Sequence, residues 1–350
     1  MSTLKQPYAL SKRPRRLKIL FLLLTGLVML SYNAWRYYWP LESSDVLNRI
    51  ELWRAGVRSA QRGGLHVFVH DLCEKSEGEG SESSVSAGDC TCVALVHGLG
   101  DTAQTWKRLL LAPRKSWRGP VRLYAWDLPG AGDSPVPLHP SDYRAQIQAS
   151  TLDHALAEVS ECPRWTVVGN SLGGWLAPWM LLKTKPAQAV SISRLLLLDP
   201  AGIKPTVSES PSLLEKPTLE SMKQFQKKAY AHPRELPDFV WKAVVEKMKD
   251  SQVPQIRAAQ TPEDFLDGPE FGKAWKAQFH SRSLPILILH GQRDQITPQA
   301  EAESITKILP GSKLREVPDC GHLPQKECPQ VVMKTLNEFL YGEVDPHPSP

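Results

Sequence analysis

Cysteine is scarce in this sequence, and none of it is spaced for metal binding. The chain of 350 residues holds six cysteines, namely Cys73, Cys90, Cys92, Cys162, Cys320 and Cys328. They form no C-x-x-C pair and no Cys/His zinc pattern, so we expect no metal site. In an oxidising compartment Cys73 would pair with Cys90 or Cys92, and Cys320 with Cys328. Unpaired thiols are the alternative, because spacing alone does not settle connectivity.

A surplus of basic charge is also missing from most of the chain. The net charge of +5 is set by residues 1–18, which hold six lysines and arginines and no acid, so that the rest carries 36 basic against 37 acidic residues. A nucleic-acid-binding domain shows a concentrated basic footprint. We therefore expect no nucleic-acid partner. The apolar (41%) and charged (23%) fractions are those of a globular protein.

Long apolar runs are lacking except for one near the N-terminus. Seventeen uncharged residues extend from Ile19 to Trp35 and, as a helix, would measure about 26 Å against a hydrocarbon core of about 30 Å. We expect a single-pass transmembrane helix over residues 19–39, with a cleaved signal peptide as the alternative. The positive-inside rule then leaves the N-terminus in the cytoplasm and the large domain on the opposite side of the membrane.

Beyond this run, short stretches of Val, Leu and Ile alternate with helical or polar segments. The stretches are CVALVHG, VRLYAWD, WTVVGNS, RLLLLDP and LPILILHG. Continuous apolar strands separated by helices indicate an α/β fold, with a mostly parallel central sheet flanked by helices on both faces. Some eighty residues between the last two stretches are rich in proline and charge. They are too many for a simple connection and predict a helical cap.

The resulting domain plan has six parts. They are a basic tail (1–18), a transmembrane anchor (19–39), a membrane-proximal amphipathic helix (40–64), an α/β domain in two segments (65–202 and 283–342), a helical cap (203–282) and a C-terminal tail (343–350). Six aromatic residues of the cap either line an apolar tunnel or simply hold the cap to the domain. They are Phe225, Phe239, Trp241, Phe265, Phe271 and Trp275.

A serine stands between a strand and a helix in the stretch WTVVGNSLGGWLAP. Gly169 and Gly173 flank Ser171 in a G-x-S-x-G pattern, which is typical of a nucleophile elbow but also of a plain tight turn. A serine hydroxyl is a weak nucleophile and needs a base within hydrogen-bond reach. His322 follows the last apolar strand on a loop, just before the final helix, which makes it the candidate base.

Polar motifs follow the other strands, where the ligands of a parallel sheet collect. HGLG begins at His97, DLPGAGDS begins at Asp127, GQRD ends at Asp294 and CGH ends at His322. Together with the GNSLGG elbow and the chain order Ser, Asp, His, they make the chain from about Leu65 to Leu340 resemble the α/β-hydrolases. With its N-terminal apolar run and its LLLLDPAGI segment, the chain is similar to the membrane-anchored monoacylglycerol lipases. Its elbow is also similar to that of the meta-cleavage C–C hydrolases.

The resemblance implies a Ser-His-Asp catalytic triad. Ser171 would be the nucleophile, His322 the general base, and Asp294 the acid that orients the base. Two other acids compete for the last role: Asp199, which follows the RLLLL strand, and Asp319, which lies three residues before the histidine. The GQRD context favours Asp294, whereas Asp319 is expected to be a turn residue.

The resemblance also implies an oxyanion hole made of backbone N–H groups. One donor would be Leu172, after the nucleophile, and the other Leu99, in the HGLG turn. His97 and His290 each precede a glycine at the end of a strand. We expect them to brace their loops by hydrogen bonds rather than to transfer protons.

The function predicted from these residues is a carboxylic ester hydrolase that acts on lipid-like acylglycerols. Two alternatives remain open: a C–C bond hydrolase that uses the same triad, and a non-catalytic binding protein that has kept the fold. A decayed binding protein would be expected to lack some catalytic residue, yet every position is filled here. No cofactor is implied, and the expected partners are a lipid or ester substrate and the membrane.

Overall fold

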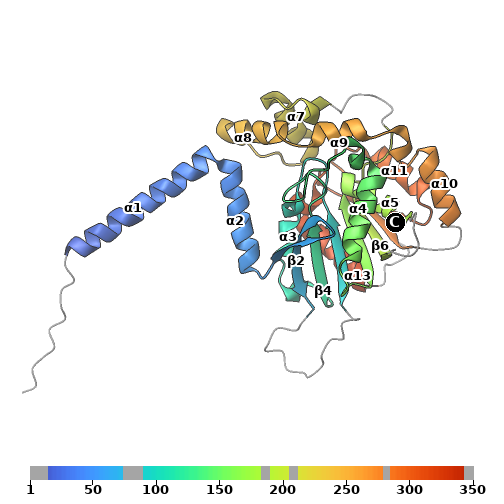
Figure 1. The fold of residues 1–350 in the computed structure, drawn as a ribbon, viewed down its shortest axis with the longest axis horizontal. Coiled ribbons are helices and arrows are strands. Elements are labelled where there is room, and N and C mark those ends of the chain that lie inside the picture. The colour runs from blue at the N-terminus through green and yellow to red at the C-terminus, as the bar shows by residue number, and fades with distance from the viewer. Residues whose placement is uncertain (1–14, 74–89, 183–189, 205–211, 279–283, 343–350) are drawn as a thin grey trace, which may run out of the picture. The chain divides into compact units, whose positions relative to one another are not determined.

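The computed structural model describes residues 15–73, 90–182, 190–204, 212–278 and 284–342. The predicted C-terminal tail, most of the basic tail and short parts of the cap therefore lie outside the described residues. The chain divides into two compact units, residues 1–47 and 48–350. The second unit holds the sheet and the helices that cover it (Figure 1).

The N-terminal apolar run forms a helix, α1 (Arg15–Tyr38). Among the residues that the structure describes, no helix is both long and apolar enough to cross a membrane. The expected transmembrane span over residues 19–39 is therefore not supported.

The next helix, α2 (Pro40–Arg54), lies where a membrane-proximal amphipathic helix was expected. Within this helix Leu52 is buried, whereas Ile50 and Trp53 are exposed. The helix ends before Gly56, which adopts a positive φ of 87°. A short edge strand, β1 (Arg58–Arg62), follows and was not predicted from the sequence.

The central sheet has eight strands in the order β1-β2-β4-β3-β5-β6-β7-β8. Strands β1 and β2 run antiparallel to their neighbours, and all later pairs are parallel. The bounds after β1 are β2 (Leu65–Leu72), β3 (Thr91–Val96), β4 (Val121–Trp126), β5 (Arg164–Asn170), β6 (Ser191–Leu198), β7 (Ile286–Gly291) and β8 (Lys313–Val317). The mostly parallel α/β fold is confirmed.

Helices cover both faces of this sheet, because side chains alternate between two apolar clusters along each strand. Val93 and Leu95 of β3 belong to one cluster, with α3 (Lys107–Leu110) and α13 (Pro329–Tyr341). Ala94 and Val96 belong to the other, with α4 (Ala145–Ala157), α5 (Leu172–Leu181) and α11 (Gln299–Ile308). Strands buried on both faces explain why their sequences are continuous apolar runs.

The described part of the segment between β6 and β7 is helical. It contains α6 (Ser212–Glu215), α7 (Leu219–Ala229), α8 (Asp238–Lys249), α9 (Val253–Ala259) and α10 (Pro269–Gln278). Figure 1 shows α7, α8 and α9 lying over one end of the sheet. This is the end at which the strands have their carboxyl termini. Gly100, in the loop after β3, lies close to two cap residues, since a Cβ on it would be 3.3 Å from Met248 and from Val253. The cap helices thus cover the carboxyl ends of the strands.

Three disulfides join the six cysteines. Cys73–Cys90 and Cys320–Cys328 are pairings that the sequence left open. Cys92–Cys162 joins residues 70 apart and was not anticipated, because only the pairing of β3 beside β5 brings these two positions together.

Candidate active site

Ser171 occupies a strained turn between β5 and α5. Its φ of 51° and ψ of −113° lie in a region that non-glycine residues rarely adopt, at a cost of about 1–3 kcal/mol. A Cβ on Gly169 would collide with the Gly173 carbonyl, and one on Gly173 with the Val96 carbonyl. The two glycines therefore allow the tight strand–helix approach of a nucleophile elbow. A hydrogen bond from the Ser171 N–H to the Leu198 carbonyl, 3.0 Å, holds the turn against β6.

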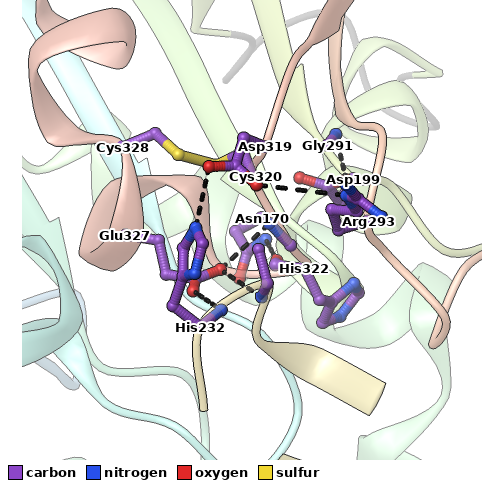
Figure 2. The surroundings of a disulfide bond; sticks show 12 residues. Asn170, Asp199, His232, Gly291, Arg293, Asp319, Cys320, His322, Glu327 and Cys328 are labelled. Carbon is purple, nitrogen blue, oxygen red and sulfur yellow. Dashed lines mark hydrogen bonds and ion pairs between the residues drawn. A yellow bond between two sulfur atoms is a disulfide. The ribbon is translucent and has the colours of Figure 1, made fainter. Parts of the chain in front are cut away.

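His322 and Asp294 are hydrogen bonded to each other. The distance from His322 Nδ1 to Asp294 Oδ2 is 2.8 Å, and both side chains are buried. The Asn170 side chain, next to the serine, donates to the His322 carbonyl at 2.9 Å (Figure 2). The base loop is thereby attached to the elbow. No hydrogen bond joins the Ser171 hydroxyl to a side chain in the described part of the chain.

Asp294 is held as an ionised acceptor. Burial alone would raise its pKa, but His322 and the hydrogen bonds from Thr297 and Ile296 lower the pKa below its usual value. Oδ1 accepts from the Ile296 and Thr297 N–H groups at 2.7 and 3.2 Å, and Oδ2 accepts from the Thr297 hydroxyl at 2.6 Å. Thr297 was missed from the sequence, although an Asp in a turn commonly accepts hydrogen bonds from the residues two and three positions later, as in DQIT.

Asp199, the first competing acid, lies close by but has a different environment. It is completely buried, adopts a φ of 43°, and accepts from the Gly291 N–H at 2.8 Å. Burial and the neighbouring charge of Asp294 raise its pKa well above the usual value. His290 Nδ1 lies 3.2 Å from it, and burial lowers the pKa of this histidine. Neither residue is bonded to His322 in the described structure.

Asp319, the second competitor, is an exposed turn residue. Its φ is 56°, and its carboxylate pairs with His232 at 2.8 Å rather than with His322 (Figure 2). The structure therefore brings together Asp294 and His322 and leaves the other two acids apart from the base.

One group of side chains beside the site could be considered for metal binding. It consists of Asp199, His290 and Asp294, whose possible ligand atoms lie within 4.8 Å of one another. Such a group has the composition of a metal site. Both oxygens of Asp294 are already used by His322, Thr297 and Ile296, however. We therefore assign these three residues to the hydrogen-bonded loops around Asp294 and not to a metal site.

The backbone N–H groups of Leu99 and Leu172 are available as oxyanion donors. Leu172 is the first residue of α5, where the helix leaves its N–H groups without internal partners and favours negative charge. The HGLG turn comes close to the nucleophile, since a Cβ on Gly98 would lie 3.1 Å from the Ser171 Cβ. His97 braces this turn: its Nδ1 donates to the Gly98 carbonyl at 2.8 Å and its Nε2 accepts from the Leu128 N–H at 3.0 Å.

The Cys320–Cys328 disulfide closes a ring that contains His322 (Figure 2). Side chains of this ring contact three neighbouring segments. Gln325 donates to Thr105 and to Asn170 at 3.1 and 3.0 Å, and Lys326 pairs with Asp101 at 2.7 Å. These residues were not predicted from the sequence, because they are polar residues of a short helix, α12 (Pro324–Glu327), with no distinctive motif.

Glu327 links the same ring to the cap. Its carboxylate accepts from the N–H groups of Gly321, Ala231 and His232 at 2.9 to 3.1 Å. The His322 N–H donates to the Ala229 carbonyl at 2.7 Å, at the end of α7. The position of the base is therefore coupled to that of a cap helix.

The aromatic residues of the cap divide into two groups. Phe225 and Trp241 belong to an apolar cluster that also contacts Leu99 of the oxyanion turn. Phe265 stacks on Trp175 of α5, and Phe271 packs between Trp179 and Trp275. The second group attaches the cap to the domain, Leu99 also packs against the cluster that holds this group, and Phe239 belongs to neither group.

Comparison with known proteins agrees with this geometry. A sequence model described as "Alpha/beta hydrolase family" matches residues 93–335, more than half of the chain.

The chain belongs to the alpha/beta hydrolase family.

Curated relatives in the family include lipases. The chain is 26% identical over 252 residues to Lipase 3 of Moraxella sp., covering 70% of this chain and 75% of that protein. It is 26% identical over 239 residues to Lipase 1 of Psychrobacter immobilis, covering 67% and 71%. These relatives support hydrolase activity.

Solved structures of the family share the fold. A membrane phospholipase A described as a bacterial virulence factor superposes with a TM-score of 0.63 at 23% identity, over 92% of this chain and 98% of that one. A meta-cleavage product hydrolase superposes with a TM-score of 0.57 at 20% identity, over 81% and 97%. Because both ester and C–C hydrolases match, these likenesses define the fold alone.

Proposed function

We propose that this alpha/beta hydrolase cleaves carboxylic esters through an acyl-enzyme and that its substrates are lipid-like acylglycerols. The observation that carries the proposal is the buried 2.8 Å hydrogen bond from His322 to an ionised Asp294, in a loop attached to the strained Ser171 elbow. A buried carboxylate that fixes the imidazole is the arrangement a serine nucleophile needs.

The proposed reaction uses this geometry in two steps. Because Asp294 accepts from Nδ1, the Nε2 atom of His322 is left to take the Ser171 proton as Oγ attacks the ester carbonyl. The N–H groups of Leu99 and Leu172 stabilise the oxyanion. His322 then protonates the leaving alcohol, and water releases the acid from the acyl-enzyme by the reverse proton path.

The preference for an acyl chain rests on the cap. The cluster that contacts Leu99 contains Met222, Trp241, Val245 and Val253, all apolar and buried. An apolar surface beside the oxyanion turn suits a hydrocarbon chain. The lipase relatives at 26% identity support the same substrate class.

Labelling with a fluorophosphonate and a series of esters of increasing chain length test this proposal. We expect an adduct on Ser171 in the wild-type protein and no ester hydrolysis by Ser171→Ala, whose fold is kept because only the hydroxyl is removed. The matched control is Ser150→Ala, on the exposed face of α4. Hydrolysis by Ser171→Ala near the wild-type rate contradicts the nucleophile. If the wild-type protein cleaves the carbon–carbon bond of a meta-cleavage product and hydrolyses no ester, the C–C hydrolase alternative is favoured.

We also propose that the N-terminal segment attaches the protein to a membrane, with the catalytic domain on the side opposite the basic tail. Leu27, Val28, Met29 and Leu30 of α1 are 62–70% exposed, which is unusual for four consecutive apolar residues. The three disulfides fit an oxidising compartment, as expected for a domain that has crossed a membrane. Carbonate washing tests the attachment: release of the full chain, or a mature N-terminus near Asn33, contradicts it.

A further inference from the structure

A second chain of Ser, His and Asp side chains lies at the edge of the sheet. The Ser59 hydroxyl is 2.8 Å from His66 Nε2, and His66 Nδ1 is 2.7 Å from Asp127 Oδ2. Ser59 belongs to the edge strand β1 and His66 to β2, while Asp127 directly follows β4. No residue of this chain of hydrogen bonds is shared with the site around Ser171.

The acid of this second chain is an ionised acceptor, as Asp294 is. Burial would raise the pKa of Asp127, but the His66 hydrogen bond and the Ala103 and Asp133 N–H groups lower it. Those N–H groups donate to its two oxygens at 2.6 and 3.1 Å. A carboxylate that accepts from Nδ1–H leaves the His66 Nε2 atom with its lone pair toward the Ser59 hydroxyl.

The base and the acid are also fixed in place. The His66 N–H donates to Ser134 Oγ at 2.9 Å, this hydroxyl donates to the Asp127 carbonyl at 2.6 Å, and the Asp127 N–H donates to the His66 carbonyl at 3.0 Å. The rings of His66 and Phe68 meet edge to face at 4.8 Å. Both His66 and Asp127 are buried, whereas Ser59 is exposed. A buried, oriented base therefore faces a hydroxyl that solvent can reach.

Two further charged side chains lie near His66 and Phe68. Asp133 Oδ2 lies 3.6 Å from His66 Nε2, where it would stabilise the imidazolium formed when the base takes a proton. Arg49 pairs with Asp133 at 2.6 Å, and its guanidinium lies 5.5 Å above the ring of Phe68, the residue paired with Ser59 across β1 and β2.

We propose that Ser59 is a second activated nucleophile, which accepts acyl or phosphonyl groups from activated esters independently of Ser171. The Ser59 oxygen forms a bond to the ester carbonyl carbon while its proton passes to His66 Nε2. The carbon–oxygen bond to the leaving group then breaks, and the departing alkoxide takes that proton. Ser59 lies in extended β-structure rather than at a helix N-terminus, so it is a site of covalent modification and not a second turnover site.

Fluorophosphonate labelling of the full-length Ser171→Ala variant tests the proposal, because the main nucleophile is then absent. Here Oγ attacks phosphorus, fluoride leaves and His66 takes the proton. We expect peptide mass spectrometry to find the adduct on Ser59 at a rate about 100-fold above that of exposed Ser150, the size of effect that a positioned base supplies. Adding His66→Gln should lower the Ser59 rate to that of Ser150. Equal rates at the two serines in the Ser171→Ala chain overturn the proposal.

A second measurement leaves His66 and Asp127 in place. In the Ser59→Cys and Ser150→Cys variants, we expect iodoacetamide at neutral pH to alkylate position 59 at least about tenfold faster, because the adjacent imidazole takes the thiol proton. Similar alkylation rates at the two positions overturn the proposal. The two proposals are tested separately. Labelling of the Ser59 peptide tests the second nucleophile, whereas labelling of the Ser171 peptide in the wild-type protein tests the proposed function.

Discussion

Asp294 and Asp199 follow neighbouring strands of the sheet, yet the pKa values of the two buried carboxyl groups are shifted in opposite directions. The pKa of Asp294 is lowered, whereas that of Asp199 is raised. The difference arises because Asp294 receives hydrogen bonds from His322 and Thr297, while Asp199 receives one from the Gly291 N–H and faces the Asp294 charge. At the scale of single residues, the partners of a carboxyl group and not its depth decide its role.

Exchanging each acid for its amide separates these roles. We expect Asp294→Asn to lower kcat by about 10³- to 10⁴-fold, because an amide no longer stabilises the imidazolium. Asp199→Asn keeps an acceptor of the same size for the Gly291 N–H and should change kcat less than about threefold, because Asp199 makes no hydrogen bond to His322 in the described structure. Steady-state kinetics on one soluble ester measures both. A large loss in Asp199→Asn with a small one in Asp294→Asn would exchange the two assignments.

Glu301 on α11 gives a pH dependence of stability. Burial, with the charges of Asp294 and Asp267, raises its pKa to about 7. Because the folded pKa lies above the unfolded one of about 4.3, the stability that the protonated group contributes is lost as pH rises from about 4 through 7. Thermal melts of Glu301→Gln should exceed the wild-type Tm by a few degrees at pH 8 and match it near pH 4. An equal shift at both pH values contradicts the assignment.

At the scale of elements, the disulfide ring from Cys320 to Cys328 couples the base to its surroundings. Lys326 binds the oxyanion loop, Gln325 binds the elbow, and Glu327 binds the segment after α7. Each contact joins elements that are far apart in the sequence. The ring therefore fixes His322 relative to the nucleophile and to the cap.

Breaking the Cys320–Cys328 disulfide should lower kcat more than breaking a disulfide that lies far from the candidate site. We expect the double variant Cys320→Ser, Cys328→Ser to lose about 10- to 100-fold in kcat, since displacement of a catalytic group by about 1 Å has effects of this size. The matched control is Cys73→Ser, Cys90→Ser, which opens a disulfide at the far end of β2 and β3 and should change kcat less than about twofold. Equal losses in kcat at matched stability would refute a positioning role for the ring.

At the scale of the whole molecule, residues 48–350 form a compact unit that contains every proposed catalytic residue. The exposed apolar residues of α1 belong to the other unit. Catalysis and the proposed membrane attachment are therefore assigned to different parts of the chain. This separation can be tested by truncation.

Removal of residues 1–39 leaves α2 intact and keeps the catalytic unit. We expect kcat/KM for a short, water-soluble ester to stay within about twofold of the full chain. Activity on long-chain esters embedded in vesicles should fall by about tenfold or more, because attachment raises the local substrate concentration. Both rates are compared with full-length Ser171→Ala as the blank. An equal fall on both substrates would show that the segment supports the fold instead.

Much of the fold and part of the site followed from the sequence. Buried parallel strands are encoded as continuous apolar runs, so the α/β class and the positions of β3 to β7 were predictable from local patterns. The nucleophile elbow was also predictable, because Gly169 and Gly173 are needed for a close approach that the structure contains. Strand β1 was missed, since RSAQR is a short, polar edge strand that lacks an apolar pattern.

What the sequence determined by itself was the kind of each element and the order of the reactive residues, because periodicity, glycine positions and motif order are local properties of the chain. Only the tertiary structure decided which residues meet. The hydrogen bonds of His322 with Asp294, of Asn170 with the base loop, and of Ser59 with His66 depend on strand register and on loop packing. They join residues between 7 and 152 positions apart, and no local pattern specifies such distances.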